Sequence, residues 1–362
     1  MKRLTYIDNI RILLASLVVL HHLAVSYAAQ GTWYQTHGST TGISFLVFSG
    51  FLAFNQSFFM GFLFLISAYF TPASYDRKGF FIFIKERIFR LGIPLLFYVI
   101  VIHPFLNHIM KGGFTVVSLD YFKPFIERYD ILGLGHMWFI ALLLIFDLLY
   151  AVFRVSHARI KKLRLPGDIA ILVFALILAG ANFVVRIWVP MDRIFKPIDL
   201  HVPFLTQYTG LFIAGLFAYS GDWFSKASAG LWKILALILA GLIPVGLTLT
   251  SNQTIYFGGF TVYSLLFCLW EQLFGISVIL TLIVWFRDNA NKSNSFVSAL
   301  SASSYATYVF HQFALIPAAL FLAVLEINVL LRFLIAAPIA LALSFSMGWA
   351  VRKLPGFRTV FS

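Results

Sequence analysis

The sequence predicts an all-α polytopic membrane protein with about ten transmembrane helices and with both termini in the cytoplasm. Of its 362 residues, 60% are hydrophobic and 11% are charged, whereas soluble domains carry about a quarter charged residues. The mean hydropathy is +0.90. Apolar stretches of about 20 residues, enough to cross a bilayer, recur along the whole chain. Since the loops between them are short, we expect residues 1–362 to form a single membrane-embedded domain.

Ten candidate spans alternate with polar loops. They cover residues 7–28, 43–72, 90–110, 135–154, 168–189, 203–220, 233–250, 260–286, 303–325 and 329–351. The second span is long for one crossing, so a bend at Gly50 or Gly61, or a division into two helices, is expected there.

The basic residues orient these spans. Of the 27 Lys and Arg residues, nineteen fall on the side that holds the N-terminus, six fall in the opposite loops, and Arg11 and Arg186 lie within spans. Cytoplasmic loops are rich in Lys and Arg. We therefore expect a multi-pass protein of the cell (plasma or inner) membrane, and the net charge of +13 reflects topology rather than nucleic acid as a partner.

The first span carries Arg11 and His22 in an otherwise apolar run. Eleven residues make about three helical turns, so the two side chains share one face, roughly 16 Å apart. Ionisable residues inside a membrane are costly and usually functional. His22 is a candidate general acid or base, because imidazole titrates near neutrality.

The third span begins with the basic sequence KERIFR, in which Arg87 and Arg90 share a face. Guanidinium groups bind phosphate through paired N–H donors. Arg11, Arg87 and Arg90 are therefore candidates for holding a phosphorylated cofactor at the cytoplasmic side. The alternative is ordinary flanking of a helix end by positive charge.

The fourth span opens with His136 and Trp138, which we place at the outer interface, where a substrate from outside would arrive. Asp147 lies deeper in the same span and needs a partner, for which an arginine from the cytoplasmic end is suited. Trp138 alone is also typical of interfacial anchoring.

Two later spans carry further polar groups. Glu271 falls near the middle of the eighth span, where a carboxylate faces the bundle interior and a partner. It is expected to orient a histidine or bind a hydroxyl, or to form a structural ion pair. Tyr308 and His311 form a polar stripe on the ninth span, which is suited either to binding substrate or to joining helices.

Several common enzyme motifs are missing from the sequence. It has no phosphate-binding glycine loop, no HExxH pattern and no GxSxG elbow. The single cysteine, Cys268, lies in an apolar run, so we expect neither a disulfide nor a cysteine metal site, and no metal cofactor.

These residues together resemble the acyltransferase type 3 family of integral-membrane acyltransferases. Arg11 and His22 match its arginine, ten residues, histidine pattern. Further matches follow in the family's order, and they are FLFLISAYF at 62–70, Arg87 to Arg90, His136-Met137-Trp138-Phe139, and Ser304-Tyr305 with Tyr308 and His311. The second part is similar to the branch that contains the succinyltransferase of osmoregulated periplasmic glucans, although Ala68 stands where the family commonly has glycine.

The resemblance implies an enzyme that transfers an acyl group, acetyl or succinyl, from cytosolic acyl-CoA to a hydroxyl of an extracytoplasmic glycan, glycolipid or other carbohydrate. Arg11, Arg87 and Arg90 would hold the coenzyme A phosphates. His22, with Glu271, would carry the catalysis. His136, Trp138, Tyr308 and His311 would bind the acceptor.

A proton-coupled transporter or flippase of an anionic small molecule or glycolipid is the alternative function. It explains the intramembrane Arg11, Glu271 and His311 as a binding and proton-coupling set, but it does not explain the ordered family motifs. The acyl group, the acceptor, the choice between a covalent intermediate and direct transfer, and the oligomeric state stay open.

Overall fold

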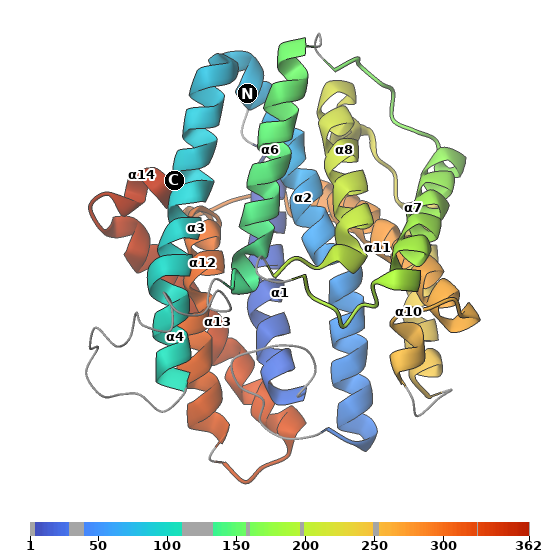
Figure 1. Ribbon diagram of the computed structural model, residues 1–362, viewed down its shortest axis with the longest axis vertical. Coiled ribbons are helices and arrows are strands. Elements are labelled where there is room, and N and C mark those ends of the chain that lie inside the picture. Colours follow the sequence, from blue (N-terminus) through green and yellow to red (C-terminus); the bar gives the residue numbers. More distant parts are fainter. Residues whose placement is uncertain are drawn as a thin grey trace.

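The computed structural model describes residues 4–28, 40–110, 133–156, 160–195, 199–248, 253–323 and 325–361. It is a bundle of long helices (Figure 1). Among these residues the one β feature is an isolated bridge between Phe195 and Leu200. The predicted all-α fold is confirmed.

The long helices are α1 (Thr5–Ala28), α2 (Gly42–Arg87), α6 (Trp138–Ser156), α7 (Asp168–Trp188), α8 (Leu205–Gly221), α10 (Gly230–Thr248), α11 (Val262–Asn289), α12 (Ser295–Ala323) and α13 (Val329–Lys353). Short helices are α3 (Ile93–Phe97), α4 (His103–Met110), α9 (Trp223–Lys226) and α14 (Phe357–Phe361). The 3₁₀ turns are η5 (Gly135–Met137), η6 (Val202–Phe204) and η7 (Gln253–Tyr256), and two π-helical segments are η1 (Ile88–Gly92) and η2 (Tyr98–Ile102).

Within the described ranges, nine helical stretches are long and apolar enough to cross a membrane. One of them, Gly42–Leu106, has 65 residues and would extend about 98 Å if straight. It reverses at Gly79, whose φ of 72° and ψ of 176° leave the helical region. Figure 1 shows α2 rising to this point and η1, α3 and α4 descending beside it. Each of its two arms is long enough to cross a bilayer, so the described residues include ten such helical arms, in agreement with the about ten helices that the sequence predicts.

The position of this reversal corrects the expected bend. α2 runs on past Gly50 and Gly61, and only Gly79 is non-helical within it. A positive φ with extended ψ is essentially accessible to glycine alone. Gly61 has a different role, because a Cβ there would lie 2.5 Å from Leu211 of α8. Its missing side chain allows α2 and α8 to approach closely, as small residues do between membrane helices.

The helix α1 lies inside the bundle and packs against α2, α11, α12 and α13. Leu14, Val19 and Leu23 are fully buried along it. At its start, the Asn9 side-chain amide donates to the Ala290 carbonyl at 2.7 Å, which ties α1 to the end of α11. The helix that carries Arg11 and His22 is therefore held on several sides.

Candidate active site

A cavity of about 1210 Å³ lies among α1, α2, α10, α11, α12 and the start of α6. Five histidines and two carboxylates line it: His21, His22, His103, His136, His201, Asp199 and Glu271. The volume exceeds the roughly 300–1,000 Å³ of ordinary small-molecule pockets. Among the described residues, no group of three His, Cys, Asp or Glu side chains is arranged to hold a metal ion.

His22 is bonded to a second histidine behind the cavity wall. Its Nδ1 lies 2.9 Å from Nε2 of His311, and the two ring planes are 10° apart. Nδ1 of His311 lies 2.8 Å from the carbonyl oxygen of Tyr308. A carbonyl only accepts, so His311 carries its proton on Nδ1 and, when neutral, accepts at Nε2. His22 therefore donates from Nδ1, and its own lone pair is on Nε2.

His22 and His311 do not both face the cavity, as two independent site residues would. His22 lines the cavity, whereas His311 is fully buried behind it. The hydrogen bond between them joins the first and ninth predicted spans, a contact that the sequence alone does not indicate. The two rings form one unit that fixes the tautomer of His22.

His136 lies within this cluster, buried inside the bundle. It is 4% exposed, and its ring centroid lies 4.7 Å from that of His311 and 6.1 Å from that of His22. The Tyr308 hydroxyl donates to the His136 carbonyl. Neither ring nitrogen of His136 has a hydrogen-bond partner among the residues described. Its ring borders the cavity, but both ring nitrogens are themselves buried, so a ligand would reach one of them only after the ring turns.

Trp138 and Tyr308 complete this side of the cavity. Trp138 stacks on Tyr208 with ring centroids 5.4 Å apart, and its ring lies 5.3 Å from His201. Tyr308 uses its hydroxyl on His136 and its carbonyl on His311. Both residues line the cavity, and Tyr308 also holds the two histidines in place.

The segment before α8 covers the cavity from the predicted outer side. Asp199 adopts a positive φ of 46°, and its Oδ2 accepts from the backbone N–H of Gly135 at 2.8 Å. Such a conformation is uncommon for a residue other than glycine and often marks a functional site. It connects this segment to the turn that presents His136.

Glu271 forms the second polar centre of the cavity wall. Its Oε2 accepts from Arg186 at 2.8 Å, from Asn182 at 3.1 Å and from Gln272 at 3.0 Å. All these donors reach the same oxygen, and Glu271 lines the cavity. Arg186 is fully buried and also donates to the Pro203 carbonyl at 3.2 Å. Glu271 is thus a carboxylate held by an arginine, with one face toward the cavity.

The three candidate phosphate-binding arginines lie apart from the histidines. Arg11 pairs with Asp8 at 3.3 Å, and its guanidinium lies 4.8 Å over the Phe70 ring. Arg87 forms an ion pair with the buried Asp147 at 3.2 Å, as expected for Asp147. Arg90 lies in η1, and its carbonyl accepts from Tyr305 at 2.7 Å.

None of these arginines belongs to the cavity lining found among the described residues. Arg11 precedes His22 by eleven residues in the unbroken α1, which separates them by about 16 Å along the axis. The structure therefore places the arginines and the histidines at two levels of the bundle.

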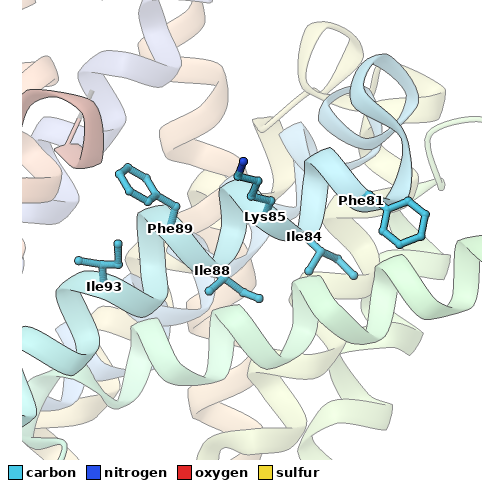
Figure 2. A pocket seen from close by; sticks show the side chains of 6 residues that line it. All are labelled: Phe81, Ile84, Lys85, Ile88, Phe89 and Ile93. Carbon is cyan, nitrogen blue, oxygen red and sulfur yellow. The ribbon is translucent and has the colours of Figure 1, made fainter.

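A second hollow lies on the outer surface of the descending arm after Gly79 (Figure 2). It is lined by Lys85 and five apolar side chains, two of which, Phe81 and Ile88, are 83% and 49% exposed. An open apolar face of this kind on a membrane helix faces lipid, and we assign it no chemistry.

Several residues of the site are missing from the sequence-based candidates: the cavity-lining His21, His103, Asp199 and His201, and Arg186, which holds Glu271 from behind the wall. Arg186 is detectable in the sequence, since a charge within an apolar span needs a partner. Helical spacing points His21 about 100° away from its neighbour His22, yet it stacks on Phe59 at 5.0 Å and faces the same cavity. Asp199 and His201 belong to a loop, and no pattern in the sequence predicts that this loop reaches the cavity.

Comparison with known proteins agrees with the family that the sequence motifs indicate. A family model described as an acyltransferase domain matches residues 4–349, nearly the whole chain. A search of curated proteins gave no match to the chain. Given the family match and the membrane-crossing helices, the chain belongs to the acyltransferase type 3 family and is a membrane acyltransferase.

Proposed function

We propose that the protein transfers an acetyl or succinyl group from cytosolic acyl-CoA to a hydroxyl of an extracytoplasmic carbohydrate, in the plasma (inner) membrane. The observation that carries this proposal is the hydrogen-bonded series from His22 to His311 to the Tyr308 carbonyl. It presents a neutral imidazole with its lone pair on Nε2 beside a cavity large enough for a sugar.

In the proposed reaction, His22 acts as general base. Its Nε2 takes the proton of the acceptor hydroxyl while the hydroxyl oxygen attacks the thioester carbonyl carbon. The new C–O bond forms, the C–S bond breaks, and coenzyme A leaves as the thiolate, which then takes up the proton. His311 stabilises the imidazolium that forms on His22, because its Nε2 accepts from His22 Nδ1 throughout.

His136 and Glu271 orient the reactants. The His136 ring borders the cavity, and once turned so that one of its buried nitrogens faces the cavity it would donate to the thioester carbonyl oxygen. Glu271 accepts a second sugar hydroxyl, since Arg186 fixes its position.

The donor would reach this centre from the predicted cytoplasmic side. Arg11 is 39% exposed although it pairs with Asp8, whereas Arg87 pairs with the buried Asp147. Arg11 and Arg90 are therefore the better candidates for the coenzyme A phosphates. The extended pantetheine arm is the part of the donor suited to span the about 16 Å between Arg11 and His22.

The test is acyl-CoA turnover by the purified protein in lipid nanodiscs. Acetyl-CoA and succinyl-CoA are each supplied with a glucan oligosaccharide, and free thiol and acylated sugar are measured for wild type and His22→Ala. We expect both proteins to bind one CoA ester and only wild type to release thiol together with acylated sugar. Failure of folded wild type to bind either ester would overturn the proposal and favour the transporter.

A further inference from the structure

The cavity continues beyond the histidines into a limb between α10 and α11. We define this apolar limb by Leu242 and Val245 of α10 and by Tyr263, Leu266, Phe267 and Trp270 of α11, all of which line the cavity. The Trp270 indole donates to the Leu239 carbonyl at 2.8 Å, which joins the two helices at the inner end of the limb.

The rim of the apolar limb lies on the lipid-facing surface. Leu242, Val245, Tyr263 and Leu266 are 51%, 52%, 44% and 55% exposed, although each also lines the cavity. α10 and α11 are both membrane-crossing helices. An exposed apolar side chain on such a helix faces hydrocarbon, so the cavity reaches the bilayer at this rim.

The rim lies at the end of the bundle that the charge pattern predicts to be outside. Leu242 and Val245 belong to the last turns of α10, and Tyr263 and Leu266 to the first turns of α11. Figure 1 shows these helices together on one side of the bundle. Arg11, a candidate donor-binding residue, lies near the start of α1, about 16 Å before His22, which separates the limb from the donor's expected path.

The inner end of the limb is polar. Glu271 follows Phe267 by four residues on α11, so the two side chains lie on one helix face, and both line the cavity with His22. A ligand that fills the whole cavity therefore needs a hydroxylated head between Glu271 and His22 and an apolar chain that extends outward between α10 and α11.

We propose that the acceptor is a lipid-linked sugar of the outer leaflet, which reaches His22 sideways from the bilayer with its hydrocarbon chain in the apolar limb. This inference rests on the proposed function and specifies its acceptor class. A free sugar would fill only part of a cavity of about 1210 Å³ and would leave the apolar limb without a matching group.

The first test compares octyl β-glucoside with methyl β-glucoside as acceptors for the protein in nanodiscs, with whichever of acetyl-CoA and succinyl-CoA it uses. We expect kcat/KM to be about tenfold or more higher for the octyl compound, the gain from burying a few methylene groups. Leu266→Trp, which narrows the rim, should abolish this preference. Equal values for the two acceptors in wild type would overturn the proposal.

A matched control separates the limb from general partitioning into the bilayer. Leu237 is on α10 and 68% exposed, but it does not line the cavity. Leu237→Trp adds the same bulk to the lipid-facing surface as Leu266→Trp and leaves partitioning of the octyl compound into the bilayer unchanged. It should therefore retain the octyl preference. Loss of the preference in both variants would contradict a specific limb.

A second readout does not depend on catalysis. An octyl glucoside with a diazirine in its alkyl chain is irradiated with the protein in nanodiscs, and the labelled peptides are identified. We expect labels in α10 and α11 that excess octyl glucoside removes and that Leu266→Trp reduces. Absence of such labels would overturn lateral binding even if free sugars are acylated. Competed labelling without acylation of any sugar would reject the proposed function and retain the lipid site.

Discussion

Nε2 of His311 lies 2.9 Å from Nδ1 of His22, while the other nitrogen of His311 faces the Tyr308 carbonyl at 2.8 Å. Because the carbonyl is an obligatory acceptor, a neutral His311 donates to it from Nδ1 and accepts from His22 at Nε2. His22 is thereby kept in the tautomer that a general base at the cavity requires. His311, which does not line the cavity, thus decides the tautomer of His22, which does.

His311 should act as a positioning residue. His311→Phe removes the acceptor for His22 Nδ1, so we expect kcat to fall by about 10²-fold or more with the KM for acyl-CoA unchanged. His311→Gln, whose amide oxygen can accept the same hydrogen bond, should restore part of kcat. The pH dependence of kcat should also differ between His311→Phe and wild type. If His311→Gln is as inactive as His311→Phe and both keep the wild-type pH profile, His311 has only a packing role.

Replacing one residue of the Arg186–Glu271 pair should destabilise the protein more than replacing both. Arg186→Met leaves the buried Glu271 without its guanidinium, and removal of one partner from such a pair costs about 3–5 kcal/mol. The double variant Arg186→Met/Glu271→Leu should recover much of that stability while acceptor turnover stays low. Thermal unfolding in detergent, followed by intrinsic fluorescence, measures the stability of the single and double variants, and an acyl-transfer assay measures their turnover. A single variant as stable as wild type would contradict the buried pair.

Arg87 and Arg11 should separate into structural and binding roles. Arg87→Met leaves Asp147 buried without its cation, so the unfolding temperature should fall, and Asp147→Asn in the same chain should restore it. Arg11→Gln is on a half-exposed side chain and should instead raise the KM for acyl-CoA with little change in stability. Equal effects of Arg11→Gln and Arg87→Met on donor affinity would contradict this division.

Gly79 should not tolerate a side chain. Its φ of 72° and ψ of 176° belong to a region that costs other residues about 1–3 kcal/mol, so Gly79→Ala should lower the unfolding temperature. Gly180 is an interior helical glycine of α7, and a Cβ added there would meet no atom within 4 Å. Gly180→Ala should be neutral or slightly stabilising. Similar losses of stability at both glycines would show that the cost at Gly79 does not come from its backbone conformation.

The sequence predicts the helices well because length and apolarity decide membrane crossing. It also predicts that Asp147 needs an arginine, since a buried charge has few possible partners. It does not predict the reversal at Gly79, because glycines occur throughout α2 and only the tertiary fold decides which one adopts a positive φ.

The site is harder to predict, because its geometry comes from contacts between distant spans. His22 and His311 are each visible as intramembrane histidines, but their 2.9 Å contact joins residues 289 positions apart. The sequence places His136 at the interface because it precedes an apolar run and a tryptophan. The sequence does not show that the His136 ring is buried beside His311, nor that Asp199 accepts from the backbone of the turn that carries it.

The most direct test of the central claim is a single-turnover measurement of acyl transfer with His22→Ala and His22→Gln beside wild type. Enzyme in excess is mixed with radiolabelled acyl-CoA and acceptor, and acylated acceptor is followed with time after bound donor is quantified. If His22 is the general base, both variants bind donor as wild type does and form product at least about 10²-fold more slowly. Product formation at the wild-type rate by either variant, with donor bound, would contradict the claim.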